Sequence, residues 1–410
     1  MLETISKYKD TPIGKIPVDW EVKKLGDFGE TFSGLSGKNK EDFGKGYPYI
    51  PYKNIFQNSK IDINFMDYVD IKENENQNKV QYGDIFFTTS SETADEVGMS
   101  SVLLDQIDIM YLNSFCFGFR LKNNNILDPL FSSYLLRGEK IRKELNVLAQ
   151  GSTRFNMSKS QLIKLIIPIP PLSEQQKIAD ILSTWDKAIQ ETGNIIKSLE
   201  KRNKALAFSL LRGKLSDGKI KELPLSKFLT HTPREIDKPK ANYLALGIRS
   251  HGKGIFHKPD SDPKVIAMEK LFEVKEHDFI VNITFAWEHA VAIISKNDEG
   301  GLVSHRFPTY VINNTIISTE YFRHYILQPF FKHMLDNISP GGAGRNRVLS
   351  KKDLMKLKIE VPNLVEQTKI AEILNTANKE LQQYQQKLNN LKTQKKGLMQ
   401  QLLTGKVRTV

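Results

Sequence analysis

Residues 158–215 read SKSQLIKLIIPIPPLSEQQKIADILSTWDKAIQETGNIIKSLEKRNKALAFSLLRGKL, and residues 350–407 read SKKDLMKLKIEVPNLVEQTKIAEILNTANKELQQYQQKLNNLKTQKKGLMQQLLTGKV. The two stretches align without a gap at an offset of 192 residues. About 25 of the roughly 58 aligned positions are identical, whereas chance would give only a few. This is an internal duplication, with a period far longer than the ~20–50 residues of a solenoid repeat.

Segments ahead of each repeat also correspond, more faintly. The pairs are 25–28 with 225–228, 82–86 with 276–280, and 131–135 with 322–326. All eight histidines lie in the second half, so the contents of the two globular parts have diverged. We expect an α+β protein with two pseudo-symmetric α/β domains and two long helices. The predicted segments are 1–157 (first domain), 158–215 (first helical spacer), 216–349 (second domain) and 350–410 (second helical spacer). Two copies of a domain suggest a partner that is two-part or two-fold.

Local signals predict where the two helices begin and end. Ser173 with Gln176, and Asn363 with Glu366, have the spacing of a capping box. Prolines 168, 170, 171 and 362 cannot continue a helix, so we place them before its start. Glycines 213 and 405, each followed by lysine, suit left-handed C-caps.

Apolar residues within each helix recur at steps of four and three. This 3.5-residue seam, sustained over more than four heptads, is typical of a coiled coil. Each seam has a polar residue at the same step, Asn203 or Lys395, and such a residue typically fixes register at a cost in stability. The first seam is Ile178, Leu182, Trp185, Ile189, Thr192, Ile196, Leu199, Asn203, Leu206 and Leu210, and the second is Ile370, Leu374, Ala377, Leu381, Tyr384, Leu388, Leu391, Lys395, Leu398 and Leu402.

Two arrangements of these helices are open. Each helix could pack along its own domain, or the two helices could pair with each other. We favour the pairing, because a helix that packs only on its own domain would not need an apolar seam of more than four heptads. From Ile178 to Leu210 a helix spans ~50 Å, which matches roughly 15 base pairs of B-DNA.

Composition bounds the class of protein. The chain has 410 residues and 40% hydrophobic residues, and we see no apolar run near the ~18 residues of a membrane span. Its N-terminus lacks the pattern of a signal peptide, so we expect a cytoplasmic protein without membrane contact. Cys116 is the only cysteine, which excludes internal disulfides and multi-cysteine metal sites. The net charge of +12 attracts polyanions without identifying one.

Motifs for catalysis are missing from the sequence. We find no phosphate-binding loop, no glycine-rich nucleotide fingerprint, and no H-E-x-x-H, C-x-x-C or G-x-S-x-G. The histidines form no i,i+4 pair, and Glu92, Asp95 and Glu96 are better explained as a solvated loop than as a magnesium site. We therefore expect no catalytic residue, no metal and no cofactor in this chain.

The repeated motifs resemble those of the specificity (S) subunit of type I DNA restriction-modification systems. They are E-Q-x-K-I-A-x-I-L at 174–182 and 366–374, and L-L-x-G-K at 210–214 and 402–406. The opening I-G-x-I-P-x-D-W-E-V at 13–22 and G-S-T-R-F-N-x-S at 151–158 also match. The resemblance covers the whole chain.

The resemblance implies two target-recognition domains, each reading one half of an interrupted site in double-stranded DNA. It implies that the two helices form an antiparallel coiled coil that sets the spacing between the half-sites. It further implies two modification (methyltransferase) subunits, which bring S-adenosylmethionine and methylate adenine at N6. Restriction (translocase and nuclease) subunits, which use ATP and magnesium, join them. The helical seams and neighbouring surfaces serve as subunit interface.

The second half departs from the family's pattern. It lacks the tryptophan-containing opening, and reads GGAGRNR at 341–347 where the first half has GSTR at 151–154. We expect the two domains to read different half-sites.

Reading bases requires Arg, Lys, Asn, Gln, Ser or Thr on exposed loops. In the first domain the candidates are Ser36, Lys38, Lys53, Asn54, Thr88, Thr89, Ser90, Ser91, Ser152, Thr153 and Arg154. In the second they are Arg249, Ser250, His251, Asn282, Thr284, His305, Arg306, Arg345, Asn346 and Arg347. A coiled-coil adaptor that binds proteins, and a nuclease with an unrecognised metal site, are the competing functions.

Overall fold

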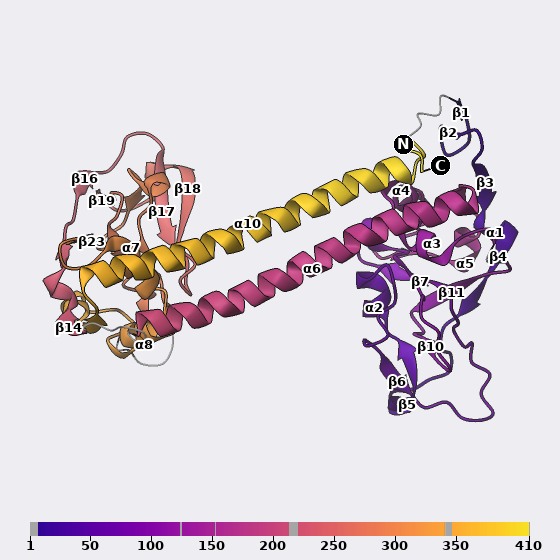
Figure 1. Cartoon of the computed structure of the whole chain (residues 1–410), viewed down its shortest axis with the longest axis horizontal. Helices are drawn as coiled ribbons and strands as arrows, with labels where there is room; N and C mark the ends of the chain where they lie inside the picture. The colour runs from indigo at the N-terminus through magenta and orange to yellow at the C-terminus, as the bar shows by residue number, and fades with distance from the viewer. Residues whose placement is uncertain are drawn as a thin grey trace. The chain divides into compact units, whose positions relative to one another are not determined.

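The computed structural model describes residues 7–123, 125–151, 153–212, 220–339, 341 and 347–409. The chain forms two compact units (Figure 1). Unit 1 contains residues 1–193 and 387–410, and unit 2 contains residues 194–386. Each unit therefore includes one part of each long helix, α6 (Leu172–Leu211) and α10 (Leu364–Leu402).

Unit 1 is built around two sheets. An antiparallel four-stranded sheet has the order β4 (Gly29–Ser33), β11 (Cys116–Leu121), β7 (Ile85–Thr88) and β9 (Ser100–Val102). A second sheet has the order β10 (Tyr111–Leu112), β5 (Phe43–Ile50) and β6 (Asp67–Val69), with β10 parallel to β5. Two-stranded ribbons pair β1 (Tyr8–Lys9) with β2 (Ile16–Pro17), β8 (Ser90–Ser91) with β12 (Phe155–Asn156), and β3 (Glu21–Lys24) with β13 (Ile166–Ile169). The helices are α1 (Leu25–Phe28), α2 (Tyr52–Gln57), α3 (Pro129–Leu135), α4 (Glu139–Leu148) and α5 (Lys159–Leu162).

Unit 2 repeats this plan with additions. Its four-stranded sheet has the order β15 (Leu229–His231), β23 (Thr309–Ile312), β20 (Phe279–Val281) and β21 (Val291–Ile293). Its second sheet has the order β16 (Glu235–Asp237), β19 (Lys270–Glu273), β22 (Leu302–Val303), β17 (Tyr243–Ile248) and β18 (Ile255–Ser261). Strand β14 (Lys221–Pro224) pairs with β24 (Lys358–Val361), and the shorter helices are α7 (Thr319–Tyr325), α8 (Pro329–Asn337) and α9 (Lys351–Lys356). Strands β16 and β19 extend the second sheet beyond the three strands of unit 1.

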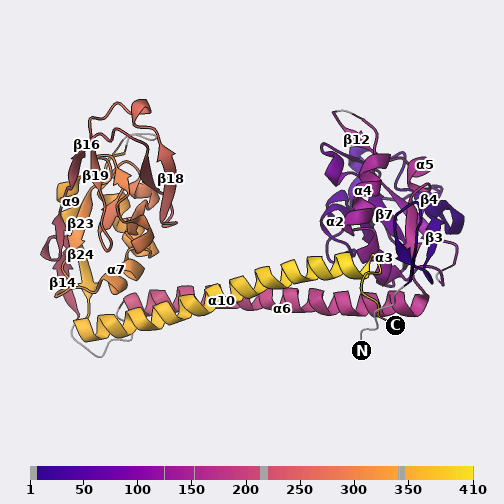
Figure 2. The ribbon, with the colours of Figure 1, turned by 90° about the horizontal axis from the view of Figure 1, so that it is seen from above.

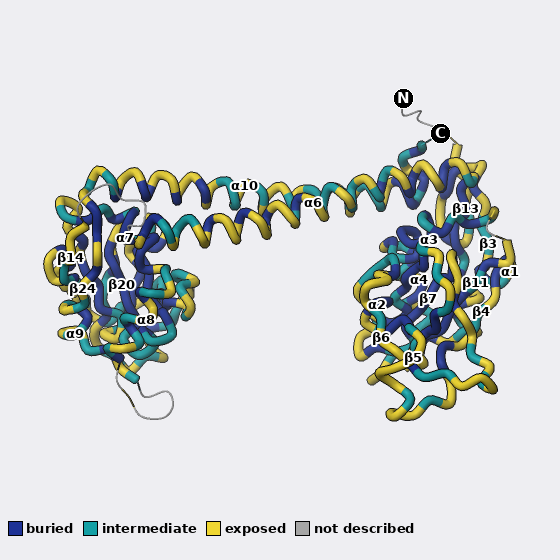
Figure 3. Tube along the Cα trace, turned by 60° about the horizontal axis from the view of Figure 1, so that its bottom comes forward, coloured by how far each residue is buried: buried dark blue, intermediate teal, exposed yellow. Residues whose placement is uncertain are grey.

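Aromatic and branched apolar residues explain why the central strands are buried. All four residues of β7, Ile-Phe-Phe-Thr, are buried, as are Phe-Ile-Val of β20. A strand buried on both faces reads as a continuous apolar run rather than an alternating one. In unit 1, Phe87 of β7 stacks on Phe117 of β11 with ring centroids 5.7 Å apart. Figure 3 shows that buried residues fill the interior of each unit's sheets.

A buried glutamine holds the start of each long helix in the same way. Gln175 donates from Nε2 to the carbonyl oxygens of Ile126 and Pro170, both at 2.9 Å, and accepts from the amide of Asp128 at 2.8 Å. The corresponding Gln367 donates to the carbonyls of Ile316 (3.3 Å) and Pro362 (2.9 Å), and accepts from Ser318 N at 2.8 Å. The amide satisfies backbone groups that burial would otherwise leave unpaired. The duplication seen in the sequence is thus repeated in hydrogen bonds.

The seam residues of α6 and α10 are buried or half-buried, while most residues between them are exposed. Figures 1 and 2 show the two helices side by side and antiparallel. In unit 2, Asn203 of α6 donates to the carbonyl oxygen of Ala377 in α10, and Arg202 pairs with Glu380 at 2.6 Å. In unit 1, Lys395 of α10 pairs with Asp186 of α6. Both polar seam residues therefore contact the opposite helix, and the predicted α+β fold with an antiparallel helix pair is confirmed.

Short helices connect each domain to the helix pair. Within unit 1, α3 lies against α6 and α10 (Figure 2), and its Tyr134 hydroxyl donates to Asp186 at 2.6 Å. Lys60 reaches the same hydroxyl at 2.9 Å. Within unit 2, His324 of α7 bonds through Nε2 to Asn375 Oδ1 of α10 at 2.8 Å.

The predicted N-cap of α10 agrees with the structure, and the predicted N-cap of α6 does not. Asn363 caps α10, accepting from the amide of Glu366 at 3.0 Å. The prediction of Ser173 as the cap of α6 is wrong, because α6 already begins at Leu172 and the preceding residue is Pro171. At the other end α10 stops at Leu402, and Gly405 follows with a left-handed φ of +71°. Gly213 lies outside the described residues.

Candidate nucleic-acid interface

Three loops meet at matching places in the two units. Loop A follows β7 (residues 89–92) or β20 (residues 282–285). Loop B precedes β11 (residues 113–115) or β23 (residues 304–308). Loop C precedes α5 (residues 151–158) or α9 (residues 347–350), within the described residues.

The same two backbone hydrogen bonds join the loops in both units. Loop A binds loop B through Thr89 N to Phe115 O at 3.2 Å in unit 1, and through Ile283 N to Arg306 O at 3.0 Å in unit 2. Loop C binds loop A through Met157 N to Thr89 O, and through Leu349 N to Ile283 O, both at 2.8 Å. The backbone framework is conserved between the units, so the side chains that it presents are free to differ.

In unit 1 the framework brings together five of the predicted DNA contacts. Thr153 and Arg154 are exposed on loop C, and Thr89 lies on loop A with its hydroxyl bonded to Phe115 O at 2.8 Å. Ser90 and Ser91 form β8, which pairs with loop C. The hydroxyl of Ser91 is buried and donates to Glu96 at 3.2 Å.

Three other predicted contacts of unit 1 are held in intramolecular interactions. Lys38 is buried and bonds to the carbonyl oxygen of Asp70 at 2.5 Å and to Glu75 at 2.7 Å. Asn54 is fully buried, with Nδ2 donating to the carbonyls of Asp62 and Phe65. Thr88 is also buried, and its hydroxyl accepts from Met99 N at 3.0 Å. These three side chains position loops rather than face solvent.

Two further predicted contacts of unit 1 lie outside the three loops. The backbone of Ser36 bonds to the Gln77 side chain. Lys53 is exposed on α2.

In unit 2 loops A and B bring together Asn282, Thr284, His305 and Arg306. The Asn282 Oδ1 accepts from Thr284 N at 3.0 Å, and Arg306 reaches the Thr284 hydroxyl at 3.3 Å. His305 and Arg306 are exposed. Arg347 of loop C lies 5.2 Å from the Trp287 ring centroid, but pairs with Asp336 at 2.6 Å.

The segment after β17 supplies the remaining predicted residues of unit 2. Ser250 donates to Glu288 Oε2 at 2.6 Å, and Arg249 is exposed. His251 is exposed and has a left-handed φ of +64°. Ser152, Arg345 and Asn346 lie outside the described residues.

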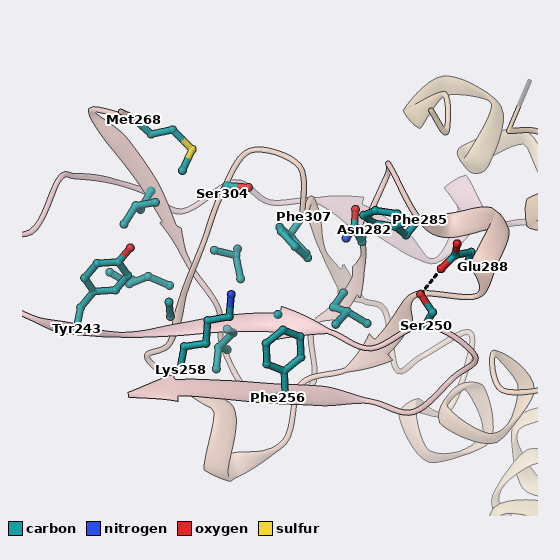
Figure 4. Close-up of a pocket in the computed structure, with 17 residues that line it drawn as sticks. Tyr243, Ser250, Phe256, Lys258, Met268, Asn282, Phe285, Glu288, Ser304 and Phe307 are labelled. Atoms are coloured by element: carbon teal, nitrogen blue, oxygen red, sulfur yellow. Dashed lines mark hydrogen bonds between the residues drawn. The ribbon is translucent and has the colours of Figure 1, made fainter. Parts of the chain in front are cut away.

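A pocket opens beside loops A and B in each unit. In unit 2 a cavity of about 520 Å³ lies between β17, β18 and the two loops (Figure 4). In unit 1 a cavity of about 440 Å³ lies between α2 and loops A, B and C. Sequence reasoning missed several lining residues, above all the aromatic ones: Phe56 and Phe115 in unit 1, and Phe256, Phe285 and Phe307 in unit 2. Phe115, which is 65% exposed, could have been suspected as an aromatic residue in a turn just before a strand.

Lys258 lines the unit 2 pocket, and three more cations lie on segments beside it: Arg249 and Lys253 between β17 and β18, and Arg306 on loop B. Arg249, Lys253, Lys258 and Arg306 are all exposed, and none forms an ion pair with a residue that the structure describes. Arg249 and Lys258 both lie over the Phe256 ring, at 5.5 and 5.4 Å from its centroid. Unpaired cations on a rim suit phosphate groups, which position a duplex without reading its sequence.

Two further classes of site were sought. Within the described ranges, no three His, Cys, Asp or Glu side chains lie close enough to hold a metal ion. None of the helices described here is both long and apolar enough to cross a membrane.

Comparison with known proteins identifies the family. The type I restriction modification DNA specificity domain matches residues 17–201 and again residues 229–393. The putative type I restriction enzyme MjaX specificity subunit of Methanocaldococcus jannaschii is 28% identical over 430 residues, covering 98% of this chain and 96% of that protein. The type I restriction enzyme EcoKI specificity subunit of Escherichia coli K12 is 25% identical over 215 residues, covering 50% of this chain and 45% of that protein.

Solved structures share the fold. The S subunit of a type I restriction-modification system from M. genitalium aligns with 96% of this chain and 98% of its own, at a TM-score of 0.52 and 17% identity. The HsdS subunit of Thermoanaerobacter tengcongensis aligns with 95% of this chain and 98% of its own, at a TM-score of 0.53 and 14% identity. Because the family's domain matches twice and accounts for both units, the chain belongs to the type I restriction-modification specificity subunit family and carries two target-recognition domains.

Proposed function

We propose that this chain reads a bipartite, interrupted DNA site and directs partner subunits to it. Each recognition domain reads one half-site through loops A, B and C. The observation that carries this proposal is the shared three-loop framework with different side chains in the two units. Where loop B presents Phe115 in unit 1, it presents Arg306 in unit 2. One framework that displays two chemistries suits a protein that reads two different sequences.

The solvent-accessible predicted residues on and beside these loops are the proposed DNA contacts. In unit 1 they are the half-buried Thr89 and the exposed Thr153 and Arg154, and in unit 2 the exposed His305 and Arg306 of loop B and Arg249 of the segment after β17. Arginine pairs with guanine or phosphate, and hydroxyls serve either, so this set can both position and specify a duplex. Loops carried on a rigid sheet are the usual place for such residues.

The helix pair is the proposed ruler between the half-sites. Asn203 and Lys395 each bind the opposite helix, which disfavours a slip of one helix along the other. A fixed register supports a fixed gap between the two sequences read.

The proposed partners supply all of the chemistry. Two methyltransferase subunits would bring S-adenosylmethionine and methylate adenine at N6, and restriction subunits would bring ATP-driven translocation and DNA cleavage. The exposed faces of α6 and α10 and the surfaces beside them are the proposed docking sites. The chain itself would be non-catalytic.

Co-expression with the methyltransferase of the neighbouring gene tests the proposal. We expect a stable complex that binds S-adenosylmethionine and methylates adenine within one interrupted motif, mapped by single-molecule sequencing. A chain that binds proteins but leaves the methylation pattern unchanged would support the adaptor. A purified chain that cuts DNA with magnesium alone would support the nuclease.

A further inference from the structure

The unit 2 pocket combines apolar walls with one polar end. Leu246, Ile248 and Phe256 of the β17–β18 ribbon line it, together with Phe285 of loop A and Phe307 of loop B. Figure 4 shows the three phenylalanines. The Ser250–Glu288 hydrogen bond closes one end of this cavity. Pockets that bind ligands typically combine apolar walls with a few placed polar groups.

Asn282 is one of the polar side chains that line this pocket. Its side chain is only 7% exposed. Its Oδ1 accepts from Thr284 N at 3.0 Å, which fixes the orientation of the amide. Its Nδ2 has no partner among the residues that the structure describes, although it lines the pocket. This donor is therefore available to an acceptor that a ligand brings into the pocket.

A second pocket lies at the matching place in unit 1. Tyr52 and Phe56 of α2, Ser90 of loop A, Phe115 of loop B and Arg154 of loop C line it. Tyr52 donates to the Ser90 carbonyl at 2.9 Å, which joins α2 to loop A much as the Ser250–Glu288 bond joins the segment after β17 to the residues that follow loop A. Each domain thus has a pocket that loops A and B line, and the other walls differ: α2 and loop C in unit 1, β17 and β18 in unit 2. This position supports a role in the reading of DNA rather than an accident of packing.

We infer that the unit 2 pocket holds the major-groove edge of a thymine in the half-site that this domain reads. The inference rests on the proposed function and names one base contact within it. A thymine edge presents the O4 acceptor beside the 5-methyl group. Asn282 Nδ2 donates to O4, and the methyl group packs against the aromatic wall. Arg249, Lys253 and Lys258 hold the flanking phosphates.

The other bases fit this pocket less well. Cytosine presents an N4 donor, which would oppose the Asn282 donor. Guanine presents two acceptors and no methyl group, so the apolar wall would gain nothing. Adenine presents an N6 donor beside the N7 acceptor, so Asn282 Oδ1 would have to accept from both Thr284 N and N6, and without a methyl group the apolar wall would gain nothing.

The test uses the full chain in complex with its methyltransferase subunits and duplexes that carry the mapped site. Each thymine in the unit 2 half-site is replaced in turn by uracil, which removes only the methyl group. We expect binding to weaken about fourfold at one of these positions, the factor for one buried methyl group. The inference would be overturned if the unit 2 half-site required no A·T pair at any position. It would also be overturned if uracil left binding unchanged at every thymine position.

A substitution in the protein tests the same contact. Asn282→Asp keeps the oxygen that accepts from Thr284 and removes the donor. We expect the ratio of affinities for thymine and for the other bases to fall about tenfold at the uracil-sensitive position. The base preferences in the other half-site should stay the same. Asn313→Asp is the matched control, because Asn313 is exposed and its Oδ1 also accepts from the amide two residues on, at 3.0 Å.

The results separate this inference from the proposed function. If the wild-type complex methylates no interrupted motif, the proposed function fails. If the motif is found but uracil and Asn282→Asp change nothing beyond the control, only the thymine contact fails. The uracil series uses wild-type protein, so a folding defect in a variant does not affect it.

Discussion

Asn203 of α6 donates a 2.8 Å hydrogen bond from Nδ2 to the main-chain carbonyl of Ala377 in α10. The side chain is 8% exposed, and its Oδ1 accepts from Arg202, which also pairs with Glu380 of α10. A buried polar residue in an apolar seam costs stability but penalises every register in which it loses its partner. This contact is thus suited to fixing how the two helices align within unit 2.

Replacing Asn203 with leucine should affect the register of the two helices without lowering their stability. We expect Asn203→Leu to raise the melting temperature of unit 2 or leave it unchanged, because leucine packs well in a seam. The gap between methylated half-sites should become variable, which sequencing of methylated DNA measures. Asn378→Leu, at an exposed position of α10, is the control and should leave the gap unchanged. A single, unaltered gap in the Asn203→Leu complex would show that this contact does not set the register.

Glu174 joins three distant segments of unit 1. It is 1% exposed and accepts from Trp20 Nε1 at 2.8 Å and from Arg408 Nε at 2.7 Å. Arg408 also bonds to Asp19 at 2.9 Å, so the C-terminal segment is held against the N-terminal segment and the start of α6. The two carboxylates raise the pKa of Arg408 above its usual value.

Glu174→Ala should destabilise unit 1 by about 3 kcal/mol, because it leaves a buried guanidinium with half of its partners. Denaturant unfolding of the full chain measures this. Glu366→Ala is the matched control at the same step of α10, where the half-exposed side chain forms no hydrogen bond or ion pair to a described residue. We expect a change within about 0.5 kcal/mol there. Equal losses for the two variants would contradict the role given to Glu174.

Low pH should weaken unit 2 before unit 1. Burial lowers the pKa of His289 and His324 below the ordinary value of 6.5. The unfolded chain then binds protons that the folded chain does not, so stability is full above pH 6.5 and is lost as the pH falls toward the folded-state values. Unit 1 contains no histidine and serves as an internal control.

Hydrogen exchange at pH 7 and pH 5.5, corrected for intrinsic rates, should show protection falling in unit 2 and holding in unit 1. His324→Gln keeps a donor for Asn375 and removes the titrating group, so part of the loss should disappear. Equal losses in the two units would indicate that carboxylates rather than histidines control this range.

Paired aspartates in the two seams should disrupt the ruler. Ile189 and Leu381 are half-buried seam residues, and Asp at such positions places charge in an apolar contact. We expect the double variant Ile189→Asp, Leu381→Asp to lose methylation of the complete site. Gln190→Asp with Gln382→Asp introduces the same charges at exposed neighbours and should retain activity. Unchanged site recognition in the seam variant would remove the ruler from the account.

The duplication made the long helices and much of the domain plan predictable. Strands β13 and β24 lie at an offset of 192 residues. The residue just before each strand, Leu165 or Leu357, accepts a hydrogen bond through its carbonyl oxygen from the amide of Leu25 or Leu225. Periodicity and repetition are local signals, so one sequence sufficed to find them. The extra strands β16 and β19 occur only in unit 2, where repetition gave no guide.

Contacts between distant residues decided which predicted site residues face solvent. Lys38 was predicted to contact DNA, but Glu75 and the Asp70 carbonyl hold it in the interior of the domain. No local pattern around Lys38 announces a partner more than thirty residues away. Phe115 and the aromatic walls of the unit 2 pocket were missed for the opposite reason, because apolar residues near a strand are ordinarily core.

The central claim is that the two domains read two half-sites independently. Its most direct test replaces residues 216–349 with those of another family member and maps methylated adenines by single-molecule sequencing. The account predicts that one half of the interrupted motif changes while the other half and the gap between them stay the same. A change in both halves, or in neither, would contradict it.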